Sequence, residues 1–408
     1  MGKDLKGKEL GVGIRQKADG IYSARYVDKF GKRKELYDRN LSSLKRKLNE
    51  ARYNDAIGNV ISDDSLTLSV WFDNWLEIYK YNVIRDNTRV YYKQVFKKYI
   101  EPILGHKKLK DITQLHIRAL LKELDKQGLQ FQTQNKVRII LLDMYNKAIL
   151  DNYAIRNPAK GIRLPKDEKI NKRVFSVEEQ IDFFDCCKGT FYDNLFIVAV
   201  NTGLRQGELC ALTWDDIDLE KKEINVEKTL LYQKLEGDAG KTFHINPPKT
   251  KTSNRKVPIN KQCEIALKKQ LIQRNNIISR QSAKPEKGFE NLLFTTKYAT
   301  PICDQILIDA IKKIVNEINL VRSEIEQFEM FTPHCFRRTF ATRCFEAGIP
   351  PKVIQKYLGH STLQMTMDLY TSVFKHCEEK AISKLSEYFI SLEDCREKNI
   401  ERKFEKQI

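Results

Sequence analysis

The sequence predicts a multidomain α+β protein. Its 408 residues exceed what a single hydrophobic core usually takes, so two or three domains are expected. Strand-type alternation fills the first part of the chain, and helical periodicity follows from Leu66 onward. We expect a β-sheet module with one helix over residues 1–62, an all-α domain over 63–156, a linker over 157–173, and a mixed, mainly α domain with a β-hairpin over 174–408.

The first module is predicted to be a three-stranded sheet covered by a helix. Apolar and polar residues alternate over Leu10–Gln16 and Ile21–Val27, and a third strand over Lys32–Tyr37 follows the turn at Phe30-Gly31. Three short strands do not stay folded alone, so the helix expected over Ser42–Ala56 should pack across them.

Basic residues line this module. A sheet that lays strands into a DNA major groove needs such a face, although basic side chains also protect an edge strand from aggregation. We favour DNA binding. The residues expected to contact DNA here are Arg15, Arg25, Lys32, Arg33 and Lys34.

The next ninety or so residues, 66–155, carry apolar residues at helical spacing and predict four or five short helices. Breaks are expected at Gly105 and Gly128. The lysines of this domain, among them Lys93 and Lys97, suit a clamp over phosphates. A plain helical bundle with a solvated basic surface is the alternative.

The charge balance indicates a polyanionic partner. Lys and Arg number 72 against 54 Asp and Glu, a formal net charge of +18, which favours nucleic acid over a membrane surface. The sequence has no apolar run of about 18 residues and begins with a charged stretch, so we expect a cytoplasmic protein. Nine cysteines without CxxC spacing fit neither a disulfide framework nor a zinc site, and no cofactor or metal is expected.

Residues 157–173 have the composition of an interdomain linker. They hold two prolines, one glycine and six basic residues without apolar periodicity. Regular structure is expected to resume at Ser176, because Ser176 and Glu179 form a capping-box pattern that starts a helix.

The first candidate for chemistry is Arg205. An apolar run ends at Gly203, and a second helix begins directly after it, which places Arg205 near a helix N-terminus where a phosphate can bind. An arginine after a glycine turn is more often part of a surface salt bridge, and Glu208 is the available partner.

The second candidate is a lysine in a β-hairpin. Strand-like segments over Glu223–Gln233 and Phe243–Ile245 precede a lysine-rich stretch, residues 247–259. A hairpin tip with Lys249 or Lys251 could place an ammonium group against a phosphodiester. An ordinary solvated hairpin is the alternative.

The last candidates lie near the C-terminal end. His334 and Arg337 stand three apart on a predicted helix and share a face. His360 follows a helix that stops at Gly359, and Tyr370 comes ten residues later. Each feature alone is more often structural than functional.

The combination resembles the tyrosine recombinase family of site-specific DNA integrases, whose six active-site positions can all be filled in this chain. The resemblance covers residues 173–389, and the helical domain also resembles the family's core-binding domain. The N-terminal module is similar to the arm-binding domain of integrases from conjugative transposons.

The resemblance implies a reaction without metal or ATP. A tyrosine attacks the phosphodiester, two arginines neutralise the phosphate oxygens, a histidine handles the tyrosine proton, a second histidine hydrogen-bonds the phosphate, and a lysine protonates the leaving 5′-oxygen. In that order the residues are Tyr370, Arg205 and Arg337, His334, His360, and Lys249 with Lys251 as its close rival.

The same resemblance implies partners and a setting. The substrate would be double-stranded DNA with core and arm-type sites, bound by a homotetramer in the bacterial cytoplasm and at the nucleoid during action, and the accessory partners to look for are an excisionase and a host DNA-bending protein. An apolar helical stripe after Tyr370 would dock on a neighbouring protomer or, equally, pack on its own domain. It comprises Ala381, Ile382, Leu385, Tyr388, Phe389 and Leu392.

Three other functions are compatible with parts of the pattern. A topoisomerase would use the same chemistry, but the separate arm-like module argues against it. A non-catalytic DNA-binding regulator is disfavoured because no catalytic position is lost. A metal-dependent nuclease would need clustered carboxylates near the histidines, which the sequence lacks.

Overall fold

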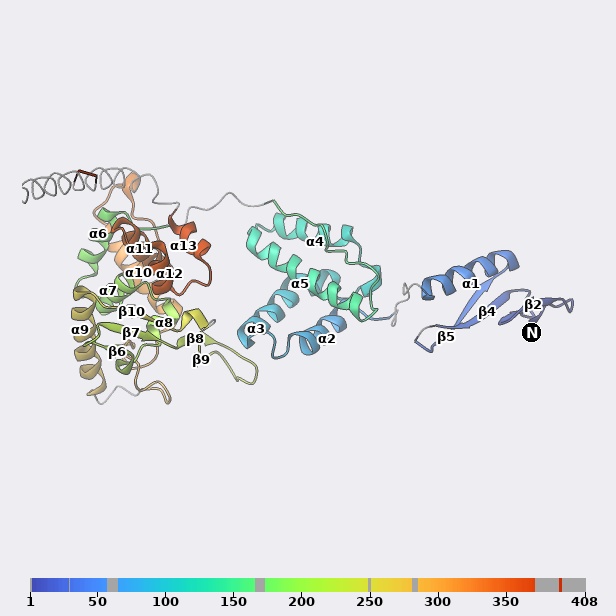
Figure 1. Cartoon of the computed structure of the whole chain (residues 1–408), viewed down its shortest axis with the longest axis horizontal. Helices are drawn as coiled ribbons and strands as arrows, with labels where there is room; N and C mark the ends of the chain where they lie inside the picture. Colours follow the sequence, from blue (N-terminus) through green and yellow to red (C-terminus); the bar gives the residue numbers. More distant parts are fainter. Residues whose placement is uncertain are drawn as a thin grey trace, which may run out of the picture. The chain divides into compact units, whose positions relative to one another are not determined.

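The structure is a computed structural model that describes residues 2–28, 30–56, 65–165, 173–248, 251–280, 285–370 and 389–390. The chain divides into two compact units, residues 1–169 and 170–408 (Figure 1). The first unit contains two separate hydrophobic clusters, one in the sheet module and one in the helical part. This arrangement confirms the α+β class. None of the helices in the described ranges is long and apolar enough to span a membrane.

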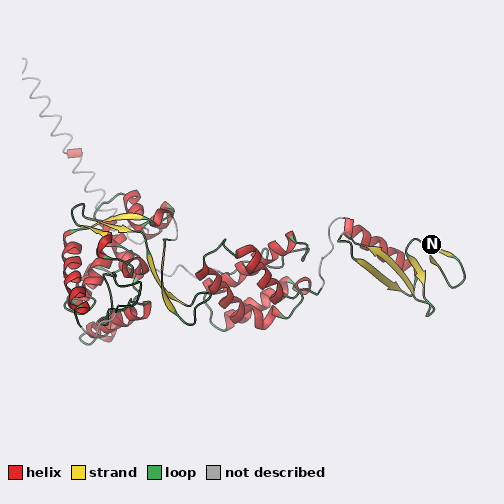
Figure 2. Ribbon diagram, turned by 90° about the horizontal axis from the view of Figure 1, so that it is seen from below, coloured by secondary structure: helices red, strands yellow, loops and turns green. Residues whose placement is uncertain are grey.

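The N-terminal module has the predicted sheet and helix. Strands β3 (Ile14–Gln16), β4 (Tyr22–Val27) and β5 (Arg33–Asp38) form an antiparallel sheet in that order, and α1 (Leu41–Ala56) packs on it (Figure 2). The predicted first strand, Leu10–Gln16, is wrong in detail. It is two strands, because Gly11 and Gly13 adopt positive φ and break it into β3 and β2 (Glu9–Gly11), which pairs with β1 (Gly2–Lys3).

The face of this sheet opposite α1 carries three of the five residues of this module that are predicted to contact DNA. Ala24 is buried towards the helix, so its neighbours in β4 point the other way. On that open face Arg15 and Arg25 both contact Glu35, at 3.6 and 3.1 Å, and Arg33 lies opposite Val27. Lys34 lies opposite Tyr26 and therefore belongs to the helix-covered face, at the edge of the sheet.

The helical domain is built around tryptophans that are buried and hydrogen-bonded. Trp71 donates to the Met144 carbonyl oxygen at 3.0 Å, and Trp75 donates to Asp143 at 2.8 Å, which joins the first helix to the last. Lys97 is exposed and Lys93 half-buried. The elements are α2 (Leu68–Lys80), α3 (Asp86–Val95), the π-type η1 (Phe96–Gly105), η2 (Leu109–Asp111), α4 (Gln114–Lys126) and α5 (Phe131–Leu150).

The predicted start of the linker, at residue 157, is wrong, because the first residues of the range 157–173 pack in the helical domain. Ala159 and Ile162 are buried in the helical cluster, and the Asn157 side chain donates to the Leu142 carbonyl oxygen at 2.8 Å. These residues therefore belong to the helical domain. Positions 166–172 lie outside the described residues.

The hydrophobic core of the second unit contains a cluster of phenylalanines, among them Phe183, Phe196 and Phe336. The capping box at Ser176 and Glu179 is present as predicted. The helices are α6 (Val177–Cys187), α7 (Asp193–Thr202), α8 (Gln206–Cys210), η3 (Trp214–Asp216), η4 (Lys251–Ser253), α9 (Lys261–Ile278), α10 (Asp304–Asn319), η5 (Glu324–Glu326), α11 (His334–Glu346), α12 (Pro351–Leu358) and α13 (Leu363–Tyr370).

The predicted hairpin is present as β8 (Thr229–Gln233) and β9 (Thr242–Asn246), but a second small sheet lies beside it in the sequence. The strand expected over Glu223–Gln233 is two strands, β7 (Glu223–Val226) and β8. β7 lies between β6 (Ile217–Asp218) and β10 (Arg255–Pro258), whereas β8 pairs with β9. Lys228, between β7 and β8, binds Asp216 at 3.0 Å. The lysine-rich stretch is therefore not a hairpin tip but the connection from one sheet to the other.

Gly203 ends α7 in a conformation that only glycine adopts cheaply. Its φ is 61°, and a Cβ there would lie 2.4 Å from Cδ1 of Phe340. Gly189 also has a positive φ, 79°, but no atom lies within 4 Å of its Cβ position.

We expect Gly189→Ala to cost about 1 kcal/mol from backbone strain alone. Gly203→Ala should cost roughly 1–3 kcal/mol more, because Phe340 must also move. Hydrogen exchange of the α7 and α9 amides measures the free energy of opening this unit in the full chain. Equal losses in the two variants would contradict the close packing at Gly203.

Candidate active site

Arg205 occupies the junction between α7 and α8. The left-handed Gly203 ends α7, and Arg205 is the residue directly before α8. Its backbone N–H and its Nη1 both donate to Glu208, each at 2.8 Å, and its Nη2 donates to the Gly359 carbonyl oxygen at 3.3 Å. The side chain remains 37% exposed. Arg205 therefore forms the predicted ion pair and still reaches the surface.

Glu208 is buried between two arginines. Its side chain is only 4% exposed, and Arg255 donates to its two oxygens at 3.0 and 2.9 Å. Burial by itself would raise the pKa of Glu208, but the hydrogen bonds and charge of Arg255, together with Arg205, outweigh burial and lower it. The carboxylate is thus held ionised, and both of its oxygens accept hydrogen bonds from the two arginines.

Three arginines converge on the C-terminal end of α12. Arg255 donates to the carbonyl oxygen of Tyr357, Arg337 to that of Leu358, and Arg205 to that of Gly359. The last carbonyl groups of a helix lack partners within the helix and carry partial negative charge, so cations are favoured there. This helix end brings together residues from β10, α11 and the α7–α8 junction.

Arg337 is the most buried of the predicted catalytic residues whose side chains the structure describes. Its Nη1 donates to the Gly203 carbonyl oxygen at 2.7 Å, and burial, followed by the positive charge of Arg205, lowers its pKa to about 9. The guanidinium is therefore protonated at neutral pH. His334 is exposed on the first turn of α11, one turn before Arg337.

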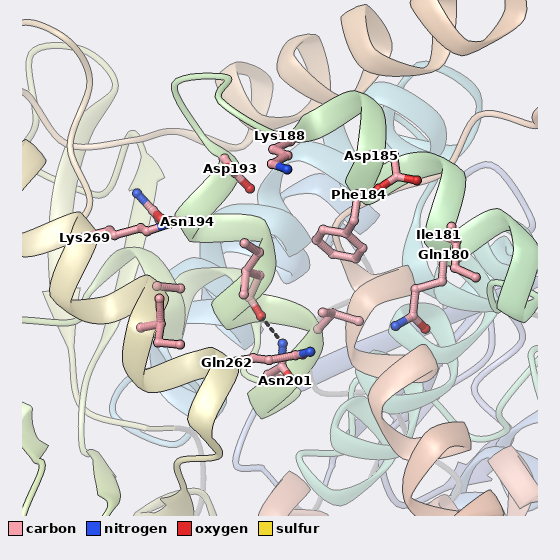
Figure 3. A pocket seen from close by; sticks show the side chains of 14 residues that line it. Gln180, Ile181, Phe184, Asp185, Lys188, Asp193, Asn194, Asn201, Gln262 and Lys269 are labelled. Carbon is pink, nitrogen blue, oxygen red and sulfur yellow. Dashed lines mark hydrogen bonds between the residues drawn. The ribbon is translucent and has the colours of Figure 1, made fainter.

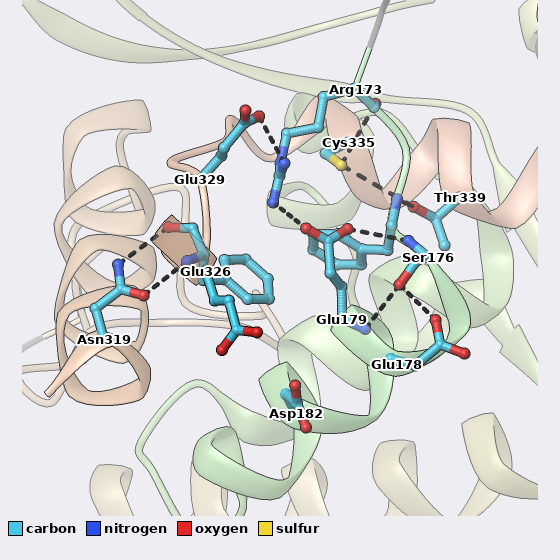
Figure 4. Close-up of polar contacts among 12 residues, drawn as sticks. Arg173, Ser176, Glu178, Glu179, Asp182, Asn319, Glu326, Glu329, Cys335 and Thr339 are labelled. Carbon is cyan, nitrogen blue, oxygen red and sulfur yellow. Dashed lines mark hydrogen bonds and ion pairs between the residues drawn. The ribbon is translucent and has the colours of Figure 1, made fainter. Parts of the chain in front are cut away.

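Arg173 and its neighbours anchor α11 from the opposite side. Cys335 donates from Sγ to the Arg173 carbonyl oxygen at 3.5 Å, and Thr339 accepts from the Phe175 backbone N–H at 3.2 Å. Figure 4 shows Arg173 reaching Glu179 and Glu329, each at 2.8 Å. The helix that carries His334 and Arg337 is thus tied to the segment that enters this unit.

His360 is neutral in this environment. It is 8% exposed, and burial, then the charge of Arg337 and other nearby cations, lowers its pKa to about 4. Its Nδ1 lies 2.9 Å from Oγ1 of Thr366, a buried residue of α13. Tyr370 is the last residue of α13, four positions after Thr366. The contact joins the end of α12 to the helix of the expected nucleophile.

The two candidate lysines are not distinguished by the structure. Lys249 lies outside the described residues, and Lys251 is described only as the backbone of η4. The C-terminal stripe after Tyr370 likewise lies outside them, apart from Phe389.

Sequence reasoning missed Arg255. The signal was the alternation of β10, in which Arg255 and Val257 face inwards while Lys256 and Pro258 face outwards. An arginine on the buried side of a strand indicates a specific acidic partner. That partner, Glu208, was predicted only as a contact of Arg205.

A separate pocket of about 480 Å³ lies among α6, α7 and α9 (Figure 3). Phe184, Asn194 and Gln262 line it, and none of the predicted catalytic residues does. Within the described ranges, no three His, Cys, Asp or Glu side chains are grouped so that they could hold a metal ion.

Comparison with known proteins places the chain in a family. Residues 175–376 match the model described as the phage integrase family, and residues 67–124 match its N-terminal SAM-like domain. A tyrosine recombinase XerC-like protein of Caldanaerobacter subterraneus subsp. tengcongensis is 31% identical over 88% of this chain and 92% of its own length. The chain belongs to the tyrosine recombinase family. It is an enzyme that cuts and rejoins DNA in site-specific recombination, as the sequence predicted.

One further relative of this chain, and one solved structure of similar fold, come from transposons. The transposase from transposon Tn916 of Enterococcus faecalis is 26% identical over 90% of this chain and 92% of its own length. The fold also matches a solved structure of the Tn1549 transposon integrase in complex with a circular intermediate DNA. That match has a TM-score of 0.66 and 24% identity, and it covers 78% of this chain and 100% of the other.

The lowered pKa of His360 predicts a loss of stability in mild acid. The folded protein resists protonating this ring down to about pH 4, whereas the unfolded chain protonates it below its ordinary pKa of 6.5. Up to about 3 kcal/mol of stability should therefore disappear as the pH falls from 6.5 to 4. Urea unfolding at a series of pH values should show this loss in the wild type and not in His360→Gln. Parallel pH profiles would contradict the assignment.

Proposed function

We propose that the chain is the integrase of a mobile genetic element and uses Tyr370 to form a 3′-phosphotyrosine bond with DNA. The observation that carries this proposal is the convergence of Arg205, Arg337 and His360 at one end of α12. The transposon proteins among its relatives support the link to a mobile element.

The charges of the site suit a phosphodiester. Arg205, Arg255 and Arg337 carry three positive charges, and Glu208 compensates one of them. A guanidinium has five N–H donors. Among the described residues, Glu208 and Gly359 accept from Nη1 and Nη2 of Arg205, which leaves its Nε–H and one N–H on each Nη for a ligand. An anion with two accessible oxygens is the ligand that such a guanidinium binds best.

The reaction is a transesterification at phosphorus. The Tyr370 oxygen forms a bond to phosphorus while the bond to the 5′-oxygen breaks, so the energy of the phosphodiester is kept for religation. Arg205 and Arg337 neutralise the charge on the non-bridging oxygens, His334 takes the phenol proton, and a lysine donates a proton to the leaving 5′-oxygen. Lys249 is our first choice for this lysine, and Lys251 is its alternative.

His360 acts in this scheme as a neutral hydrogen-bond donor. A pKa of about 4 leaves it without the extra proton that a general acid would need at neutral pH. When Thr366 donates to Nδ1, the ring proton is on Nε2 and is available to a phosphate oxygen. The contact with Thr366 then sets both the orientation of His360 and the position of α13.

The remaining domains would hold the DNA. We assign residues 1–62 to arm-type sites and 63–156 to the core site; Arg15, Arg25 and Arg33 on the open sheet face and exposed Lys97 support these roles. Exchange between two duplexes needs four cleaved strands, so a homotetramer is the expected assembly. An excisionase and a host DNA-bending protein are the expected accessory partners, and the expected location is the bacterial cytoplasm, at the nucleoid during recombination.

The nucleophile can be tested by trapping the covalent intermediate. A nicked suicide duplex carrying the element's own recombination site should give an adduct that survives SDS, forms in EDTA and is absent in Tyr370→Phe. Arg205→Ala and Arg337→Ala should lower the adduct rate by roughly 100- to 1000-fold and retain DNA binding, because each removes a donor to the developing charge. An adduct that persists in Tyr370→Phe would show that another residue is the nucleophile.

The general acid can be identified by changing the leaving group. Lys249→Ala or Lys251→Ala should slow cleavage of ordinary DNA on the order of 100-fold. A bridging sulfur in place of the 5′-oxygen leaves without protonation, since a thiol has a pKa of about 8.5. This substrate should restore the rate in the variant that lacks the general acid and leave the other variant unchanged. If sulfur restores neither, the proton comes from elsewhere.

A further inference from the structure

Arg255 is a buried arginine that the reaction scheme above does not use. Its side chain is 2% exposed, and its Nε, Nη1 and Nη2 all donate to protein oxygens, so we expect it not to contact a bound phosphate itself. A buried guanidinium is costly unless its N–H groups have partners. The hydrogen-bond partners of Arg255 therefore indicate its role.

The contacts of Arg255 join three parts of the site. Its Nη1 and Nη2 donate to the two oxygens of Glu208 at 3.0 and 2.9 Å, and Nη1 also donates to the Ser253 carbonyl oxygen at 3.1 Å. Its Nε donates to the Tyr357 carbonyl oxygen at 2.6 Å. Three of these hydrogen bonds tie β10 to α8 and to the end of α12, and the fourth reaches Ser253 of η4.

The chain makes room for this arginine at Gly359. A Cβ at that position would lie 2.9 Å from Cδ of Arg255 and 2.9 Å from the Thr252 carbonyl oxygen. Gly359 also supplies the carbonyl oxygen that accepts from Arg205. The glycine therefore lets both arginines approach the same helix end.

The bidentate contact between Arg255 and Glu208 limits how the Arg205 side chain can bind Glu208. Because Arg255 donates to both carboxylate oxygens, the Arg205 side chain donates to Glu208 only through Nη1. Without Arg255, a buried carboxylate would draw Arg205 into the bidentate arrangement that arginine and carboxylate prefer. The guanidinium of Arg205 would then turn away from the exposed side of the site.

We propose that Arg255 is a positioning residue that occupies Glu208 and so keeps the Arg205 guanidinium directed at the scissile phosphate. The proposal rests on the function proposed above. It deepens that function by naming a residue that acts through Arg205 and Glu208 without touching the DNA.

The test compares Arg255→Lys and Arg255→Met with the control Lys256→Met in the full chain. Lys256 is the next residue of β10, is exposed, and pairs with Glu223 at 3.0 Å, so the control removes a charge from the same strand outside the site. DNA affinity and the rate of adduct formation at saturating protein are measured on the suicide duplex. Both Arg255 variants should lose on the order of 10- to 100-fold in the saturating rate, since a small misplacement of a catalytic group has effects of that size.

Affinity should be unchanged in all three variants, and Lys256→Met should react like the wild type. Lysine retains the charge but cannot donate to both oxygens, so Arg255→Lys should not rescue the rate. A wild-type saturating rate in Arg255→Lys, or a loss of affinity alone, would overturn the proposal. A merely stabilising role would lower the melting temperature and leave the saturating rate of the folded protein unchanged, which would also overturn it.

The bridging-sulfur substrate distinguishes two ways in which Arg255 could affect the rate, through Arg205 or through the general-acid lysine. If Arg255 acts through Arg205, the defect persists with sulfur, because stabilisation of the phosphate charge is still missing. Recovery with sulfur would show that Arg255 acts on the lysine segment before β10, against the proposal. Tyr370→Phe, run in parallel, tests the proposed function separately: an adduct in that variant would refute the nucleophile whatever the Arg255 variants do.

Discussion

The catalytic unit depends on one constraint, which is that three arginines must be accommodated around a single buried carboxylate. Arg205 and Arg255 bind Glu208, and all three arginines donate to carbonyl groups at the end of α12. Buried guanidinium groups are tolerated only with such hydrogen bonds. The helix end is therefore as much a part of the site as the side chains are.

This constraint links segments that are far apart in the chain. Gly203 and Gly359 each end a helix in the left-handed conformation and each present a carbonyl oxygen to an arginine. Thr339 ties α11 to the backbone of Phe175, and Thr366 ties α13 to His360. Because these elements are hydrogen-bonded to one another, the geometry of the phosphate site depends on segments throughout the unit.

The sequence predicted the parts of this site that depend on local pattern. Helix ends at Gly203 and Gly359 follow from glycine chemistry, and the spacing of His334 and Arg337 follows from helix periodicity. Arg255 was not predicted, because its partner Glu208 is 47 residues away and strand pairing brings them together. The same reason explains the error at β7 and β8: a continuous strand pattern does not reveal that its halves join different sheets.

The excess positive charge has a cost for the protein without DNA. Like charges repel within a site that Glu208 only partly compensates, and His360 adds no further positive charge because it is neutral. A bound phosphodiester relieves this repulsion. The free enzyme therefore has a lower free energy of unfolding than it would have without the excess charge, but its site is already arranged for the substrate. Stability and activity are therefore in opposition at the end of α12, and substitutions that relieve the repulsion would make the fold stronger and the recombinase slower.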